Sequence, residues 1–393
     1  MGANIDGPRP LRPDEFRDAM ALAEHCFGYE SGGLEARMPH CFDESRPDRH
    51  VIIKRDDEIV SHVVCVPTEL RAGDVCVPCY GIAGVATDPD HRGNGYMTQL
   101  LEFCLRRAEE DGVPIVELEG DRVGYGRFGW ENAGREYRFR ITRRSFDAPE
   151  PVVNDGTDLV YPVRPGNADL ESIERVHEAE RYRITRDQDQ YERLLGQRGL
   201  ETLVYDGDRP AYLCHRGAEP TSVLEFGGSE RGVATLLDRV LQDDEIMLYT
   251  HPHHPLVSLF VEVSTDWTLL SHRKLNVLDL PTVLEAYEPL LEDRWTTAVD
   301  GIGTSTTGGS VTLAIAADDR NPSSRETPVT IRFEDAGVHV ERTDRKPDLV
   351  LDRRTMTHFL FGSPDACYEV KQTHPFLGTV LPLEYYFWQT ETI

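Results

Sequence analysis

Lysine is nearly absent from this chain. Only four of its 42 basic residues are lysines, against 69 Asp and Glu, and the formal net charge is −27. No Lys- or Arg-rich run is available to neutralise phosphates, which argues against a nucleic-acid partner. Concentrated salt screens the mutual repulsion of so many carboxylates. We therefore expect a folded protein with an acidic surface, from a halophile.

Long apolar runs are missing as well. A membrane-spanning helix needs ~18–20 apolar residues, and no stretch approaches that length. The opening residues MGANIDGPRPLRPDEF contain no signal-peptide core. We therefore expect no membrane partner and a cytoplasmic location.

Residues at metal-binding spacing are scarce. Eight cysteines are scattered along the chain, and reduced core thiols are the default interpretation. Cys76 and Cys79 form one CxxC without a second pair at zinc-site spacing, so alternating strand positions explain them better. The prolines around His251, His253 and His254 in THPHHP predict a surface turn. We expect no metal.

Length and periodicity predict three domains of the α/β (α+β) class, since 393 residues exceed the usual size of one core. Up to residue 145 the pattern predicts a helix over 11–29, an antiparallel meander over 51–87, a helix from about 96 to Gly112, and strands in VPIVEL and REYRFRITR.

Composition then changes twice. Residues 146–158, FDAPEPVVNDGTD, are typical of a linker. A mixed α/β segment follows to about residue 285 and has no Gly-rich loop between a strand and a helix. From about 286, three β-rich runs and the helix RRTMTHFLFGS predict a meander capped by helices.

The stretch GIAGVATDPDHRGNGYMTQ carries the main functional signal. An apolar strand, Ile82–Thr87, leads through a loop into a helix that begins at Tyr96. The first N–H groups of such a helix have no partner within it and attract a phosphate or pyrophosphate. Gly93 and Gly95 allow close approach of the backbone. The dinucleotide fingerprint would need Gly where Thr98 stands, and the Gly-Lys-Ser/Thr of a P-loop is missing.

This loop resembles motif A of the GNAT acyltransferase superfamily, Arg/Gln-x-x-Gly-x-Gly/Ala. Arg92 and Gly95 match, and Met97 departs from the usual Gly or Ala. That departure is similar to the R-x-x-G-x-L variant of the enhanced intracellular survival (Eis) branch. The run GYGRFGW at 124–130 resembles the IYGRFGY of the same branch.

The resemblance implies a domain plan. It predicts a catalytic GNAT domain over 1–145, a degenerate second GNAT-like domain over 146–285 and a sterol-carrier-protein-like domain over 286–393. It also implies a homo-oligomer, a hexamer in this branch.

The resemblance implies that acetyl-CoA is the cosubstrate. The acceptor it implies is an amine, either of a small polyamine-like molecule or of a lysine side chain. Backbone N–H groups of the splayed strand are suited to polarise the thioester carbonyl. Arg92 either contacts phosphate or pairs with Asp88 or Asp90. The residues implied for acetyl-CoA are Val85, Ala86, Thr87, Arg92, Gly93, Asn94, Gly95, Tyr96, Met97, Thr98, Gly120 and Asp121.

Tyr125 is the candidate general acid. A phenol has an ordinary pKa of ~10, so it is protonated at neutral pH and can donate to a departing thiolate. By residue chemistry alone, packing with Phe128 and Trp130 in an aromatic turn explains Tyr125 as well.

The end of the chain supplies the candidate base. In the Eis branch the terminal carboxylate, often of a Phe, reaches the active site, whereas this chain ends LEYYFWQTETI with Phe387 six residues earlier. Either the Ile393 carboxylate removes the proton from the amine, or Glu391 or a water does. The aromatic run 385–388 predicts that the tail is docked.

Two other functions stay open from the sequence: an acyl-CoA sensor without transferase activity, and a carrier of a hydrophobic ligand in the C-terminal domain.

Overall fold

The computed structural model describes residues 4–146, 159–163, 169–217, 220–241, 245–302, 308–317, 327–334 and 337–393, with the side chains of 300–302 excepted. The predicted linker lies outside these residues apart from Phe146. The described strands form one 13-stranded sheet and one 4-stranded sheet, with helices packed on both, which is the mixed α/β class expected.

The first part of the chain confirms the predicted helices and meander. Its elements are β1 (Ile5–Pro10), α1 (Phe16–Phe27), α2 (Gly33–Arg37), β2 (His50–Arg55), β3 (Glu58–Ala72), β4 (Val75–Thr87), α3 (Tyr96–Glu110), β5 (Ile115–Leu118), α4 (Arg122–Gly126) and β6 (Glu131–Thr142). β1 was not expected from the pattern. The short helix α4 lies where only turns were predicted, because the Asp121 side chain caps it by accepting from the Gly124 N–H.

The middle of the chain alternates short strands and helices. Its elements are β7 (Val160–Pro162), α5 (Leu170–Glu178), β8 (Tyr182–Ile184), α6 (Gln188–Leu195), β9 (Glu201–Tyr205), β10 (Ala211–Arg216), β11 (Thr221–Gly228), α7 (Glu230–Leu241), β12 (Glu245–Thr250), α8 (Val257–Val263) and β13 (Asp266–Val277).

The last part holds the smaller sheet and its helices. They are α9 (Leu280–Ile302), β14 (Gly309–Ile315), β15 (Val329–Glu334), β16 (Gly337–Arg342), β17 (Leu349–Leu351), α10 (Arg353–Phe361), α11 (Tyr368–Thr373) and α12 (Pro375–Val380), followed by the 3-10 turn η4 (Gln389–Glu391). The sheet order β16-β15-β14-β17 joins the predicted β-rich runs.

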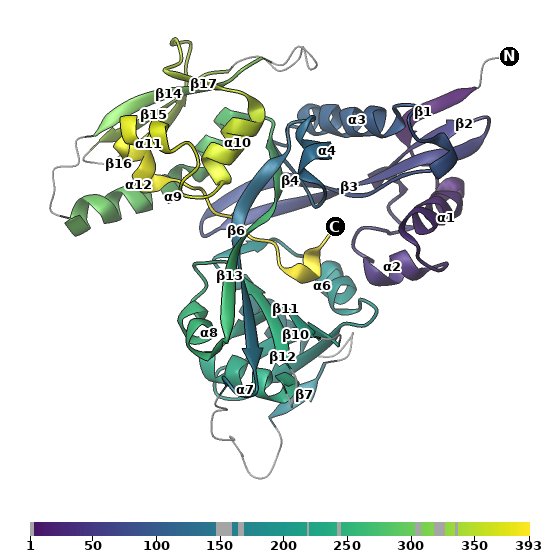
Figure 1. Cartoon of the computed structure of the whole chain (residues 1–393), viewed down its shortest axis with the longest axis horizontal. Coiled ribbons are helices and arrows are strands. Elements are labelled where there is room, and N and C mark those ends of the chain that lie inside the picture. The colour runs from purple at the N-terminus through teal and green to yellow at the C-terminus, as the bar shows by residue number, and fades with distance from the viewer. Residues whose placement is uncertain are drawn as a thin grey trace.

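One sheet joins the first two parts of the chain. Its order is β1-β2-β3-β4-β5-β13-β6-β12-β11-β10-β9-β7, and β8 pairs with β3 off this path. β13 lies between β5 and β6, antiparallel to both, so a strand from the middle of the sequence completes the N-terminal sheet. Figure 1 shows β6 and β13 running together from one lobe to the next. Since this sheet is continuous and α9 runs across residue 285, the three-domain division stays a prediction.

The prediction of a surface turn for THPHHP is wrong. His251 and His254 are only 3% and 4% exposed, whereas His253 is half exposed. His251 packs against Tyr386 with ring centroids 5.3 Å apart, and His254 against Phe226 at 4.8 Å. The turn is covered by a tail that is distant in sequence, which local composition does not reveal.

The docking of the tail is confirmed. Tyr385, Tyr386, Phe387 and Trp388 are at most 2% exposed. Figure 1 shows the tail, in yellow, crossing β6 and ending at the centre of the molecule, where the lobes meet.

A buried charge cluster holds the end of the tail. The guanidinium of Arg186, which precedes α6, donates to both oxygens of Glu225 on β11 at 2.8 and 2.9 Å and to Glu391 of the tail. Thr390 also donates to Glu225. All three charged side chains have at most 1% of their surface exposed, so the tail and the middle segment depend on one another for neutralisation.

We expect Arg186→Leu to lower the free energy of unfolding by about 3–5 kcal/mol, because it leaves two buried carboxylates without their counter-ion. Denaturant titration measures this. The matched control is Arg198→Leu, which removes an exposed ion pair to Glu30 and should cost at most ~1 kcal/mol. Equal losses in the two variants would contradict the role of the cluster.

Candidate active site

Two parallel strands part at the centre of the large sheet. β4 and β5 pair from Cys79↔Ile115 to Ile82↔Leu118, and this pairing then stops. On its other side, β4 stays paired with β3 as far as Thr87. The last residues of β4 therefore present backbone groups toward a gap rather than toward a neighbouring strand.

A bulge at this point reshapes β4. Its register with β3 shifts by one residue between Val64↔Ala83 and His62↔Ala86. Gly84 supplies the required positive φ of +58°, and a Cβ there would stand 2.8 Å from the ring of Phe42. Only glycine satisfies both constraints. The bulge shifts the register of β4 by one residue, and Ala86 and Thr87 then pair with His62 and Ser61 of β3.

The loop after β4 ends at the start of α3. Gly95 is the N-cap residue, with φ +79°, and provides no side-chain cap. The first hydrogen bond of the helix runs from the Gln99 N–H to the Gly95 carbonyl at 3.1 Å. The preceding N–H groups, of Tyr96 to Thr98, are thus the outward-facing donors of a helix start, which favour an anion.

One cavity of about 490 Å³ joins the end of β4 to the start of α3. Nine of the predicted cofactor residues line it: Val85, Ala86, Thr87, Arg92, Gly93, Gly95, Tyr96, Met97 and Thr98. The sequence reasoning missed Cys26, Phe27, His91 and Arg127, which also line it. Arg127 lies within GYGRFGW and could have been named, whereas the end of α1 gives no local signal.

Asn94 lies beside this cavity rather than on its wall, whereas Arg92 lines it. The Asn94 amide donates to the His91 carbonyl at 2.9 Å and so fixes the loop. Arg92 is exposed and donates from Nε to the Thr87 carbonyl at 3.3 Å. Neither Asp88 nor Asp90, both in the described part of the chain, forms an ion pair with it. Asp88 instead pairs with His91 at 3.3 Å.

Tyr125 lies on α4 in an apolar setting. Its ring packs edge-on against Trp130, with centroids 6.2 Å apart, and lies so close to Gly120 that a Cβ there would meet it at 2.4 Å. Burial, and then the nearby Asp121 carboxylate, raise the pKa of Tyr125 above its ordinary value. The phenol is therefore protonated at neutral pH.

Ile393 reaches the opposite face of the same strand pair. Its side chain packs over Gly81 of β4, where a Cβ would stand 2.3 Å from Ile393 Cδ1. The His40 ring contacts the Thr392 carbonyl at 3.0 Å. The last residue of the tail thus lies against β4, next to the point where β4 and β5 part.

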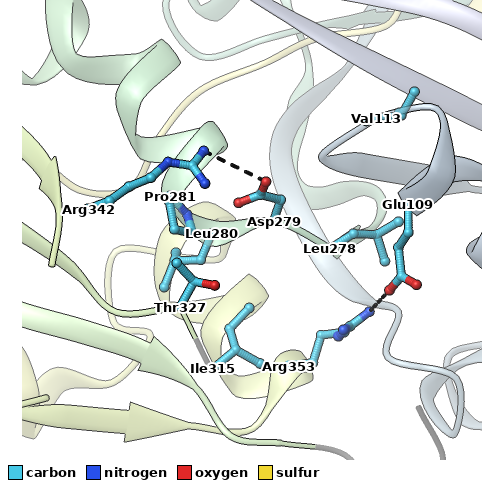
Figure 2. Close-up of a pocket in the computed structure, with 11 residues that line it drawn as sticks. Glu109, Val113, Leu278, Asp279, Leu280, Pro281, Ile315, Thr327, Arg342 and Arg353 are labelled. Atoms are coloured by element: carbon cyan, nitrogen blue, oxygen red, sulfur yellow. Dashed lines mark ion pairs between the residues drawn. The ribbon is translucent and has the colours of Figure 1, made fainter. Parts of the chain in front are cut away.

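A second cavity, of about 250 Å³, lies between the end of α3, the start of α9 and the smaller sheet (Figure 2). Figure 2 shows its charged side chains in pairs: Arg342 with Asp279 at 3.9 Å and Arg353 with Glu109 at 3.8 Å. Because these charges already neutralise one another, this cavity is a weaker candidate for an anionic ligand than the one at α3.

Neither a metal-binding group nor a membrane-crossing helix is present among the described residues. They contain no group of three or more His, Cys, Asp or Glu side chains able to hold a metal ion. None of their helices is both long and apolar enough to cross a membrane.

The geometry described so far, a parted pair of parallel strands with a glycine loop and a free helix start, matches an acyltransferase fold, and sequence comparison agrees. Residues 7–133 match the acetyltransferase (GNAT) domain family. The uncharacterised N-acetyltransferase YhbS of Escherichia coli is 30% identical over 138 residues, covering 32% of this chain and 79% of that protein. The chain therefore belongs to the GNAT N-acetyltransferases, a family of acyltransferases.

The chain is also similar to the N-acetyltransferase Eis of Mycobacterium tuberculosis. The two are 27% identical over 269 residues, which cover 61% of this chain and 66% of Eis, just under two thirds of its length.

Solved structures share the fold over the whole chain. A GCN5-related N-acetyltransferase from Kribbella flavida superposes with a TM-score of 0.70 at 18% identity and covers 100% of this chain and 99% of its own. Eis1 from Mycobacterium abscessus superposes with a TM-score of 0.66 at 15% identity, and the superposition covers 99% of this chain and 98% of Eis1.

Proposed function

We propose that this protein transfers an acetyl group from acetyl-CoA to the amine of a small polyamine-like molecule or of a lysine side chain. The observation that carries the proposal is the cavity that joins the end of β4 to the unpaired N–H groups at the start of α3. The residues fit the group: the helix start and Arg127 suit a pyrophosphate, and the parted strands suit the arm that carries the thioester.

Each step of the transfer has a candidate residue. The N–H groups of Val85 to Thr87 stabilise the negative charge that develops on the carbonyl oxygen. Tyr125 donates its phenolic proton to the departing thiolate. A carboxylate on the other face of the sheet removes a proton from the amine, and the sequence offers that of Ile393.

We also propose a wider setting from the family resemblance and the composition. The last part of the chain resembles a sterol carrier protein, the assembly is a homo-oligomer, a hexamer in the Eis branch, and the protein works in a halophile's cytoplasm. Its charge of −27 supports the last point, so assays belong at molar KCl as well as at low salt.

The two rival functions predict different assay results. An acyl-CoA sensor binds acetyl-CoA without releasing thiol in the presence of any amine. A hydrophobic-ligand carrier does not bind acetyl-CoA. Isothermal titration followed by a thiol-release assay over an amine panel separates them from the transferase.

We expect Gly95→Asp to weaken acetyl-CoA binding by more than about tenfold, since ~1.4 kcal/mol of charge repulsion at the pyrophosphate is enough for that factor. Titration calorimetry measures the affinity. No atom lies within 4 Å of a Cβ at this position, so the fold should survive. Gly199→Asp is the matched control, with φ +75° and equally open space. Unchanged affinity in folded Gly95→Asp protein would rule out this loop as the phosphate site.

Tyr125→Phe removes only the phenolic hydroxyl, so we expect kcat to fall by ~10²–10⁴ with acetyl-CoA affinity retained. Turnover is measured by thiol release with chemistry rate-limiting. Tyr137→Phe, on β6, serves as the control and should keep full activity. Normal turnover by Tyr125→Phe would leave this residue with a packing role alone.

Appending Gly-Ser after Ile393 moves the terminal carboxylate without deleting a side chain. We expect a lower kcat with intact acetyl-CoA binding, because Ile393 packs at Gly81 beside the parted strands. The same dipeptide added at the N-terminus is the control. Full activity of the extended protein would exclude the terminal carboxylate from the reaction.

A further inference from the structure

A carboxylate with no assigned role lies at the base of the parted strands. Glu117 is on β5, in register with Gly81 of β4, the second-last pair before the two strands separate. It is 0% exposed. Within the part of the chain that the structure describes, neither of its carboxylate oxygens accepts a hydrogen bond. A buried carboxylate that accepts no hydrogen bond is costly to maintain, even with an ion-pair partner at 3.8 Å in Arg273, and this points to a ligand.

Glu117 points to the face opposite α3. Val116 and Leu118 belong to the core beneath α3, and side chains alternate along a strand, so Glu117 faces the side of α1 and the tail. Its Oε1 lies 3.3 Å from the position of a Gly81 Cβ and 3.8 Å from Nη1 of Arg273 on β13. The cofactor loop and the start of α3 therefore lie on one face, and Glu117 on the other.

A small cavity borders Glu117. Its volume is about 30 Å³, the space of one water molecule and hence of one ammonium group. The rest of the wall is partly apolar, with Pro67 exposed at its edge, and its other polar side chains are His40, Thr68, Gln190 and Glu391. The apolar lining residues are Val66, Pro67, Ile184, Leu194, Phe387 and Ile393.

We propose that Glu117, in place of the Ile393 carboxylate, binds the ammonium group of the acceptor and takes its proton, and that the acceptor is a primary amine on an unbranched aliphatic chain. This inference rests on the proposed acetyltransferase function. Ile393 then closes the cavity around the amine, because its side chain packs on Gly81.

The proton transfers balance. Glu117 takes one proton from R–NH₃⁺, and the free amine attacks the thioester carbonyl and forms the C–N bond. The C–S bond breaks, and the thiolate takes the phenolic proton of Tyr125. The tyrosinate is restored by the second proton that the nitrogen loses, and Glu117 returns its own to solvent. The products are the acetamide, free CoA thiol and one released proton.

The raised pKa of Glu117 suits a general base that works near neutral pH. Burial raises its pKa from 4.5 to about 7, against the opposing effect of Arg273. The charged or titratable groups around it come from β4, β13, the tail, the loop after α2 and the end of β5: Cys79, Arg273, Tyr385, Glu391, His40, Cys41 and Glu119.

Glu117→Gln tests the proposal, with thiol release measured on linear primary diamines such as 1,5-diaminopentane at molar KCl. We expect the wild-type rate to fall as pH drops through about 7, because Glu117 becomes protonated. In the variant this fall of the rate at acidic pH, the acidic limb of the pH–rate profile, should vanish. Its kcat should fall by ~10²–10⁴ with acetyl-CoA affinity unchanged. Glu110→Gln, an exposed carboxylate at the end of α3, is the matched control. The protein with Gly-Ser appended after Ile393 should keep the acidic limb, because it retains Glu117.

Stability provides a readout independent of turnover. A raised carboxyl pKa means that the folded state loses stability as pH rises from 4.5 to about 7, whereas a Gln is unaffected. Glu117→Gln should therefore gain in unfolding midpoint relative to wild type over that window.

The possible failures are distinct. A wild type inactive toward every amine of the panel overturns the transferase function and this inference together, whereas a wild type active only on amines other than linear primary ones overturns this inference alone. An active wild type without the acidic limb, or a Glu117→Gln variant that keeps the wild-type rate and profile, overturns the role of Glu117 alone.

Discussion

The end of hydrogen bonding between β4 and β5 is the constraint on which the rest of the site depends. Up to Ile82↔Leu118 the two strands form an ordinary parallel ladder. Beyond it β4 carries the bulge at Gly84 and stays paired with β3 alone, and the chain turns through the glycine loop into α3. Donors for an anion and for a carbonyl oxygen thus converge without any charged side chain having to be buried.

The same gap separates the chemistry into two faces. Tyr125 and the cofactor cavity lie with α3, and Glu117 and Ile393 lie with α1 and the tail. In the proposed transfer, the sheet keeps the proton donor of the leaving group apart from the proton acceptor of the nucleophile, so that the two do not neutralise one another. The apolar surroundings that raise the pKa of Tyr125 also raise that of Glu117, and each shift suits its role.

The tail couples this site to the middle of the chain. Glu391 is held by Arg186, and Glu225 shares the same guanidinium. Arg273, on the strand that completes the N-terminal sheet, faces Glu117 and lies 3.5 Å from the Trp388 carbonyl. The middle segment thus fixes the tail beside the point where β4 and β5 part.

The sequence by itself determined most elements, the loop between β4 and α3, and the burial of the aromatic tail, because each depends on periodicity, glycine placement or apolar content within a short window. It also pointed to Tyr125, through a motif that the family shares. Only the tertiary structure decided that β13 completes the first sheet, that the THPHHP turn is buried, and that Cys26 and Phe27 reach the cofactor cavity. The same holds for Glu117. In the sequence it is one of 69 acidic residues, and its distinction lies in what surrounds it: Gly81, Arg273 and Ile393 come from segments far apart in the chain, and contacts at that separation leave no local pattern.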